Sequence, residues 1–342
     1  MSYKNIYILG VGGSGMSSIA KYLKQKGDNV IGYDQRKSYV TNLLNQDGIK
    51  VVHTLDEITY KPESLYIYSS AIPIESDRFE DFHDKENVLS RPEYLKNLSE
   101  NHKIIGITGT HGKTSTTALL SHIFHFNNVN VSYLYGGITT FNGIGGHYGD
   151  PDQPLILETD EAFNTFEKIK ISDLLVLNVD SDHLDYFKNL DNYKDAFYKV
   201  MKNVTDNLVI NNDDLNIKTM KELKNPVSYG KDIAADFKVQ SPGTFIYENN
   251  KYEIKSDIIG DHFKANMLGA IILALLNGIE IKDSLNAIES FAGVKRRIEL
   301  IGISKGVLIY DDYGHHPTEM EATITALKQQ TESKLYVVFQ PH

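Results

Sequence analysis

The stretch that decides the fold of this chain reads Gly109-Thr110-His111-Gly112-Lys113-Thr114-Ser115. It follows the apolar residues 104–108 and precedes a helical pattern that begins near Thr114. A buried strand, a tight glycine turn and a helix in this order direct backbone N–H groups and the positive end of a helix dipole at a bound phosphate. Lys113 would then supply a cation for the outer phosphates, and the Thr114 hydroxyl would join the shell of a Mg²⁺ ion.

This loop is shorter than the common P-loop. The common motif has a glycine five residues before the Gly of Gly-Lys-Thr, and this chain has Ile107 there. The plain alternative is an ordinary strand–helix turn that contains a lysine. The coincidence of glycines, lysine and threonine directly after a strand favours the phosphate loop.

A second glycine loop, of a different kind, lies near the start of the chain. It reads Gly10-Val11-Gly12-Gly13-Ser14-Gly15, follows an apolar strand and opens a helix, and the next strand ends at Asp34. This matches the dinucleotide fingerprint, in which an acidic residue about twenty positions on bonds a ribose. Alone, it fits a redox cofactor, a sugar nucleotide or a packing turn. Two phosphate loops in one chain favour a nucleotide-bearing substrate on one domain and ATP on the next.

Composition narrows the class of protein. The 342 residues suffice for two or three domains. The net charge of −10 and the lack of a basic tract argue against binding to nucleic acid or to an anionic membrane. Cysteine is absent, which excludes thiolate chemistry and suits a reducing cytoplasm. There is no signal-peptide pattern, and the most apolar stretch, 267–276, is far shorter than the roughly twenty residues that span a bilayer.

The rhythm of short apolar strands and helical patterns predicts α/β domains. Residues 1–100 should form a Rossmann-like domain with strands at 6–9, 30–33, 50–53 and 65–69. Residues 101–297 should form a P-loop-type ATP-binding domain with further strands at 155–157, 174–177 and 208–210, an antiparallel patch at 236–260 and a helix at 262–277. Residues 298–342 show strands at 307–310 and 335–339 around a helix at 318–329, so we expect the start of an incomplete Rossmann-like domain.

Polar side chains follow the strands of the central domain. Glu158 comes directly after the strand 155–157, at the edge where the Lys113 loop lies, and is a candidate Mg²⁺ ligand. His183 belongs to an acidic run after the strand 174–177, which would serve a metal or a substrate, or cap a helix.

Three later motifs leave more alternatives open. His262 and Asn266 share a helical face, and would read a base edge or act as capping or surface residues. Arg297 ends a basic run that is either a solvated linker or a clamp on a transferring phosphoryl group. The run 311–318, which contains His315, fits a zinc site, a general base or a helix cap.

In this order, the motifs resemble those of the Mur ligases over essentially the whole chain. The matching pieces are Gly10–Met16, Ser69–Ile72, Gly109–Thr114, Glu158–Glu161, Asp182–Asp185, His262 with Asn266, Arg296–Arg297 and Asp311–Glu319. The short phosphate loop is the family's own variant. His111 and the run Asp-Asp-Tyr-Gly-His-His-Pro point to the alanine-adding member of the family.

The resemblance implies a role for each matched residue. The UDP-substrate would be held by Gly12, Gly13, Ser14, Ser69, Ser70 and His315. ATP would be held by Gly109, Thr110, His111, Gly112, Lys113, Thr114, Ser115, His262 and Asn266. Thr114 would bind one Mg²⁺ ion and Glu158 with His183 a second metal, and Lys113, Glu158, His183 and Arg297 would be the catalytic set.

The implied reaction is an ATP-driven amide synthesis in peptidoglycan assembly, carried out in the cytoplasm by a monomer or weak dimer. The lactyl carboxylate of UDP-N-acetylmuramate would attack the γ-phosphate, and L-alanine would attack the resulting acyl phosphate.

Three alternatives remain: a sister ligase that adds a preformed peptide to the same sugar nucleotide, a nicotinamide-dependent oxidoreductase, and a noncatalytic nucleotide-binding fragment. The last is suggested by Phe163, which replaces a family carboxylate, and by the end of the chain at His342, where the family's third domain continues.

Overall fold

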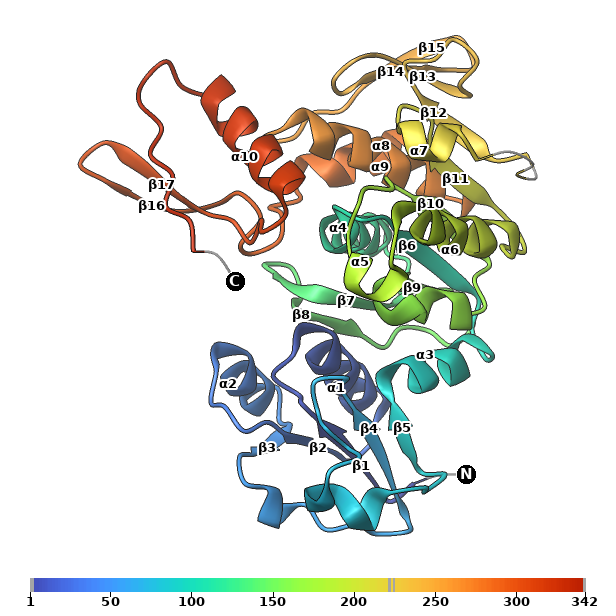
Figure 1. The fold of residues 1–342 in the computed structure, drawn as a ribbon. Helices are drawn as coiled ribbons and strands as arrows, with labels where there is room; N and C mark the ends of the chain where they lie inside the picture. The colour runs from blue at the N-terminus through green and yellow to red at the C-terminus, as the bar shows by residue number, and fades with distance from the viewer. Residues whose placement is uncertain (1–2, 221–222, 224, 341–342) are drawn as a thin grey trace.

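The computed structural model describes residues 3–340 except 221, 222 and 224. The elements form three successive α/β units (Figure 1). The N-terminal unit lies at one end, the large central sheet lies in the middle, and the last helix and hairpin lie beside the central sheet.

The N-terminal unit is a parallel sheet of five strands in the order β3-β2-β1-β4-β5. Its strands are β1 (Asn5–Leu9), β2 (Val30–Tyr33), β3 (Lys50–Val52), β4 (Ser64–Tyr68) and β5 (Val88–Ser90). Its helices are α1 (Ser14–Lys26), α2 (Tyr39–Gln46) and α3 (Arg91–Ser99), with short 3₁₀ segments at Leu55–Glu57 and Asp77–Phe82. The predicted strands and the Rossmann-like class are confirmed.

The strand order of this sheet reverses between β1 and β4, and ligands of open parallel sheets bind at such a point. Gly10 and Ser69 follow these two strands and lie against each other, because a Cβ added to Gly10 would come 3.0 Å from the Cβ of Ser69. The first glycine loop therefore sits at the reversal point of the sheet.

The central unit has a ten-stranded sheet in the order β15-β14-β13-β12-β11-β10-β6-β9-β7-β8. Its strands are β6 (Ile104–Thr108), β7 (Ser132–Thr139), β8 (Gly143–His147), β9 (Leu155–Glu158), β10 (Asp173–Val176), β11 (Leu208–Asn211), β12 (Val227–Gly230), β13 (Phe237–Ser241), β14 (Thr244–Tyr247) and β15 (Asn250–Glu253). Its helices are α4 (Lys113–Phe126), α5 (Leu184–Phe187), α6 (Leu190–Lys202), α7 (Leu215–Lys218), α8 (Asp261–Leu276) and α9 (Ile281–Glu289), with a 3₁₀ segment at Ala162–Lys168.

Both faces of this sheet are covered, which explains why its strands read as continuous apolar runs. Ile105 and Ile107 of β6 pack with α4, α8 and α9 on one face. Ile104, one residue out of phase, packs with the α6 residues Tyr193 and Phe197 on the other. The antiparallel patch expected at 236–260 is present, and β13 joins it to the main sheet beside β12.

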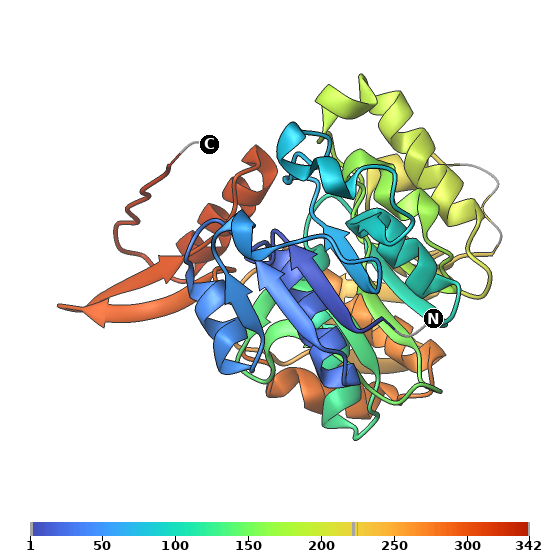
Figure 2. The same cartoon turned by 90° about the horizontal axis from the view of Figure 1, so that it is seen from below.

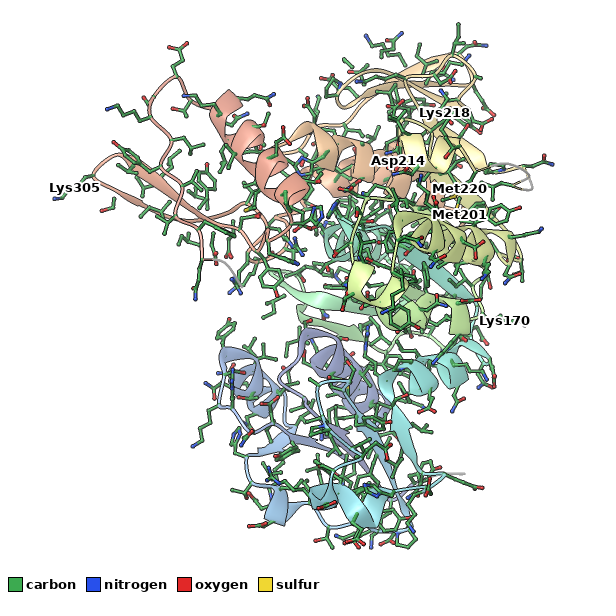
Figure 3. The ribbon with its side chains drawn as sticks, viewed as in Figure 1. Lys170, Met201, Asp214, Lys218, Met220 and Lys305 are labelled. Carbon is green, nitrogen blue, oxygen red and sulfur yellow. The ribbon has the colours of Figure 1, made fainter. Side chains whose placement is uncertain are left out.

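The third unit consists of a hairpin, β16 (Glu299–Ser304) with β17 (Val307–Asp311), and α10 (Pro317–Gln329). Lys305 marks the tip of the hairpin (Figure 3), which projects from the body of the molecule (Figure 2). The strand predicted at 335–339 is wrong: these residues have no strand pairing, and Val338 is 99% exposed. An apolar run forms a strand only where a neighbouring strand accepts its backbone hydrogen bonds.

The N-terminal and central units meet where α1 packs on the β7–β8 hairpin. The contact is very close, because a Cβ added to Gly146 of β8 would lie 2.0 Å from the Ser18 carbonyl oxygen of α1. The buried Lys21 ammonium of α1 also donates hydrogen bonds to the carbonyls of Asn142 and Ile144. Within the described residues, no helix is both long and apolar enough to cross a membrane.

Candidate active site

The second glycine loop joins β6 to α4 and has the backbone shape that phosphate binding requires. Gly109 and Gly112 have φ of +143° and +85°, a region that favours glycine. Asn178 braces the loop, because its side-chain oxygen accepts the His111 N–H at 2.8 Å and its side-chain nitrogen donates to the His111 carbonyl at 2.9 Å. α4 begins at Lys113 without a side-chain cap, so its first turn is open to an anion.

Lys113 folds back over its own loop. Its Nζ donates to the Gly109 carbonyl at 2.7 Å and to Glu161 Oε1 at 2.9 Å, and Glu161 is fully buried. Burial alone would lower the pKa of Lys113, but the charges of Glu161, Asp160 and Glu158 outweigh it and raise the pKa. Lys113 is therefore a fixed cation at the phosphate loop.

Glu158, at the end of β9, joins the loop to the β7 strand. Its Oε1 accepts the Thr114 hydroxyl at 2.6 Å, and its Oε2 accepts the Gly136 N–H at 2.6 Å. Thr114 and Glu158, both predicted as metal ligands, are therefore direct neighbours.

His183 lies in a neighbouring acidic group. Ligand atoms of Asp160, Glu161 and His183 lie within 4.8 Å of one another, a spacing that suits a divalent cation. His183 Nε2 is 3.9 Å from Glu161 Oε1, and its backbone has φ of +51°. The structure thus places His183 beside Glu161, and the predicted pairing of His183 with Glu158 at a metal stays a prediction.

Residues of α10, in the third unit, contact the phosphate loop and the segment beside it. Thr318 donates to Asp180 at 2.7 Å, and His111 Nε2 lies 3.1 Å from the same carboxylate. His111 Nδ1 lies 3.4 Å from Glu319, which also pairs with Arg297 at 3.6 Å. These contacts tie α10 to the loop.

Glu319 makes two of these contacts, one with His111 and one with Arg297. Burial would raise its pKa, but the His111 hydrogen bond and the Arg297 charge outweigh it and lower the pKa to about 2. The carboxylate therefore stays ionised and holds His111 and Arg297 near the loop.

A cavity of about 460 Å³ opens between the phosphate loop, α8 and α10, and we call it the nucleotide cavity. His262, Asn266 and Ser115 line it, and so does Arg297, which lies in the segment between α9 and β16. Burial lowers the pKa of His262, so the ring enters the cavity neutral. Asp214, labelled in Figure 3, lines the same cavity and accepts the Ile217 N–H at the start of α7.

A second cavity of about 470 Å³ lies between the N-terminal and central units, and we call it the interdomain cavity. Its lining includes the predicted substrate residues Gly13, Ser14, Ser69 and Ser70 together with Glu158. Gly12 is adjacent, and its N–H donates to Asp34 Oδ2 at 2.8 Å. Residues from both units thus face one space.

His315 lies apart from the predicted substrate residues that line the interdomain cavity. Among the described residues it lines neither cavity, and its ring is half-exposed beside Glu319, with Nδ1 3.8 Å from Oε2. The side chain of Phe163 lies outside the described part of the structure.

Sequence reasoning assigned no role to Glu161, Asn178 or Glu319, although two of them lie within matched motifs. Each acts through a partner far away in the chain, namely Lys113, His111 and Arg297. A polar residue just after a strand was the available signal for Glu161 and Asn178.

Three family models match the chain in order. They are described as the Mur ligase family catalytic domain (residues 5–103), the Mur ligase middle domain (107–274) and the Mur ligase glutamate ligase domain (296–342).

Relatives from Clostridium botulinum strain Langeland and Caldicellulosiruptor saccharolyticus, both named UDP-N-acetylmuramate–L-alanine ligase, are 35% identical. The matches cover 99% and 98% of this chain and 77% of each relative. The solved UDP-N-acetylmuramate-alanine ligase of Thermotoga maritima has a TM-score of 0.82 at 25% identity, over 96% of this chain and 78% of that one. A murein peptide ligase from Psychrobacter arcticus has the same fold, with a TM-score of 0.77 at 22% identity, over 97% and 77%.

Proposed function

Since the chain belongs to the Mur ligase family, we propose that it uses ATP to join L-alanine to the lactyl carboxylate of UDP-N-acetylmuramate in peptidoglycan synthesis. The relatives that are 35% identical carry the name of this activity. The observation that carries the proposal is that the phosphate loop lines one cavity and is hydrogen-bonded, through Thr114, to a residue that lines the other. His111, Gly112 and Ser115 face the nucleotide cavity, while Glu158, bonded to Thr114, faces the interdomain cavity.

This arrangement suits transfer of a phosphoryl group from one cavity to the other. ATP would bind with its base toward His262 and Asn266 and its outer phosphates on residues 109–115. The sugar nucleotide would bind with its diphosphate near Gly12–Ser14 and its lactyl carboxylate near Glu158. The γ-phosphate would then lie between the two ligands, within reach of Lys113.

The reaction would proceed in two steps. A lactyl carboxylate oxygen attacks the γ-phosphorus and ADP leaves, giving an acyl phosphate. The amine of L-alanine attacks the acyl carbon, phosphate leaves, and the amine loses a proton. Lys113 and Arg297 would balance the charge on the transferring group, and closure by α10 through Glu319 would keep water from the acyl phosphate.

The side chains around the loop fit Mg²⁺, because hydroxyl and carboxylate oxygens are the ligands that this hard cation prefers. We propose that Thr114 and Glu158 hold one ion, and that His183, with Asp160 and Glu161, holds a second. Bound there, the ions would neutralise phosphate charge during transfer.

We further propose that residues 1–100 bind the sugar nucleotide, 101–297 bind ATP and 298–342 supply the closing segment. The enzyme would work in the cytoplasm as a monomer or weak dimer.

The test is a four-component assay of phosphate release with ATP, Mg²⁺, UDP-N-acetylmuramate and L-alanine. Release should require all four, and Lys113→Ala should abolish it. Because the chain spans 77% of the length of its relatives, binding of ATP·Mg²⁺ and of the sugar nucleotide is measured alongside turnover by calorimetry.

Three outcomes would contradict the proposal. Phosphate release that does not depend on the sugar nucleotide would indicate another kind of ATPase. A preformed tripeptide that outcompetes L-alanine points to a sister ligase. Tight NADH binding without ATP binding points to an oxidoreductase.

A further inference from the structure

We propose that His111, Asp180 and His316 form a binding site for Zn²⁺ between the phosphate loop and α10. The three residues come from separate segments: His111 lies in the phosphate loop, Asp180 follows β10, and His316 is the N-cap residue of α10. Possible ligand atoms of these residues lie within 4.8 Å of one another. A zinc site was one interpretation of the run 311–318, and the structure supplies two further ligands for it from the central unit. This site is additional to the two Mg²⁺ positions proposed above.

The first argument is the spacing of the ligand atoms. His111 Nε2 lies 3.1 Å from Asp180 Oδ2, and His316 Nδ1 lies 3.9 Å from the same oxygen. In a tetrahedral zinc site, nitrogen and oxygen ligands at about 2.0–2.2 Å from the metal lie roughly 3.3–3.6 Å apart. The two distances lie on either side of this range, and the two rings have their centroids 4.6 Å apart. Small rotations of the rings would therefore bring the three atoms around one ion.

The second argument is the hydrogen bonding of the other ring nitrogens. His316 Nε2 lies 3.0 Å from the Ser181 carbonyl, which can only accept, so Nε2 carries the proton and Nδ1 the lone pair. Nδ1 accepts the Thr318 N–H at 3.3 Å, a long contact that a metal could replace. His111 Nδ1 faces the Glu319 carboxylate at 3.4 Å, which leaves Nε2 for a metal. A histidine that binds a metal usually donates its other N–H to a carbonyl or a carboxylate in this way.

The third ligand, Asp180, is also held in place. Its Oδ1 accepts the Ser181 N–H at 2.7 Å, and its Oδ2 accepts the Thr318 hydroxyl at 2.7 Å. Asp180 and His111 both line the nucleotide cavity, so a water molecule from that cavity would complete a four-coordinate site. The proton on His111 Nε2 would be released when Zn²⁺ binds, because imidazole binds a metal in its neutral form.

The donor set determines which metal the site would take. Two imidazole nitrogens and one carboxylate suit Zn²⁺, whereas Mg²⁺ prefers oxygen ligands alone. The ion would join the central unit, through His111 and Asp180, to the third unit, through His316. Bound Zn²⁺ would thus hold α10 against the phosphate loop.

The test titrates the protein with ZnCl₂ by calorimetry, in excess Mg²⁺ and without ATP. The unmodified protein should bind Zn²⁺ tightly at this site. His316→Asn keeps a side-chain cap for α10 but removes the imidazole. Its Zn²⁺ affinity should fall at least about 100-fold, because even the groups that support a metal ligand are worth about 10- to 100-fold. Asp180→Asn, on a separate segment, should also weaken Zn²⁺ binding. His315→Asn, which removes the neighbouring imidazole, is the matched control and should bind Zn²⁺ normally.

Thermal unfolding gives a second measurement of the same site. Zn²⁺ should raise the melting temperature of the unmodified protein and of His315→Asn, since an ion that binds only the folded state stabilises it. The melting temperature of His316→Asn should stay the same when Zn²⁺ is added.

The proposal is overturned if excess Mg²⁺ prevents Zn²⁺ binding, or if His316→Asn and Asp180→Asn bind Zn²⁺ as the unmodified protein does. It is also overturned if His183→Gln removes the tight site, since Zn²⁺ would then bind at the other cluster of possible ligands, beside Glu161. If His316→Asn does not fold, Asp180→Asn decides by the same criteria. The four-component assay tests the ligase activity separately from all of these outcomes.

Discussion

Lys113 Nζ lies 2.8 Å from Glu161 Oε2, so the cation of the phosphate loop is held by a fully buried internal carboxylate. Glu161 lies in the segment after β9. The hydroxyl of Tyr193, on α6, donates a hydrogen bond to Glu161 Oε1 at 3.4 Å. Lys113 is thereby fixed in place before ATP binds, and a bound phosphate would share it with Glu161.

Breaking this pair should strongly destabilise the protein. Glu161→Gln leaves the Lys113 ammonium largely buried without its counter-charge, and removing one partner of a buried pair costs about 3–5 kcal/mol. Urea denaturation measures the free energy of unfolding. Asp195→Asn is the control, because it breaks the exposed Asp195–Lys199 pair on α6 and should change little. Equal effects from the two substitutions would contradict the finding.

The closure of α10 on the loop should depend on pH through His111. Burial alone would lower the pKa of His111, but hydrogen bonds and charges from Glu319 and Asp180 outweigh it and raise the pKa above 6.5. The stabilisation is therefore complete below about pH 6.5 and is lost as pH rises through the raised pKa. The difference in unfolding free energy between the unmodified protein and His111→Gln should shrink from pH 6 to pH 9.

The source of this pKa shift can be tested by NMR. In Glu319→Gln, the titration of His111 should move to lower pH, because one of the two carboxylates that face the ring is neutral. An unchanged titration would mean that Asp180 alone sets the His111 pKa.

The Thr114 hydroxyl should matter for Mg²⁺ rather than for ATP itself. Thr114→Val keeps the side-chain shape but removes the group that donates to Glu158 at 2.6 Å. We expect ATP affinity to fall about tenfold in Mg²⁺ and to stay unchanged in EDTA. Thr114→Ser keeps the hydroxyl and should bind normally in both. An equal loss in both conditions would assign Thr114 to the nucleotide instead.

The contact of α1 with β8 should tolerate no side chain at Gly146. Gly146→Ala places a methyl group where the Ser18 carbonyl lies, and such overpacking costs about 1–3 kcal/mol or more. Gly302→Ala is the matched control, because no atom lies within 4 Å of the added Cβ and its φ is not positive. Thermal unfolding separates the two variants, and similar melting temperatures would argue against the close packing.

The local pattern of the sequence was enough to predict the parallel strands of the first two units and the residues of the phosphate loop. The strands at 6–9, 155–157 and 174–177 have the apolar continuity that burial on both faces demands, and the loop follows its strand directly. These features are encoded by neighbours in the chain, so periodicity and glycine placement reveal them. The strands 132–139 and 143–147 were missed, because their glycines weaken the strand pattern. Gly146 is needed only because α1 packs closely on it, and the sequence does not show that contact.

The pairing of side chains across the site was decided by the tertiary structure alone. Glu161 meets Lys113 across 48 positions, and Thr318 meets Asp180 across 138. Arg91 and Gly15 come together only because α3 and α1 start at the same edge of the sheet. By itself, the sequence determined which chemical groups are present and which elements carry them. Their distances and pKa values depend on long-range packing, which no local pattern contains.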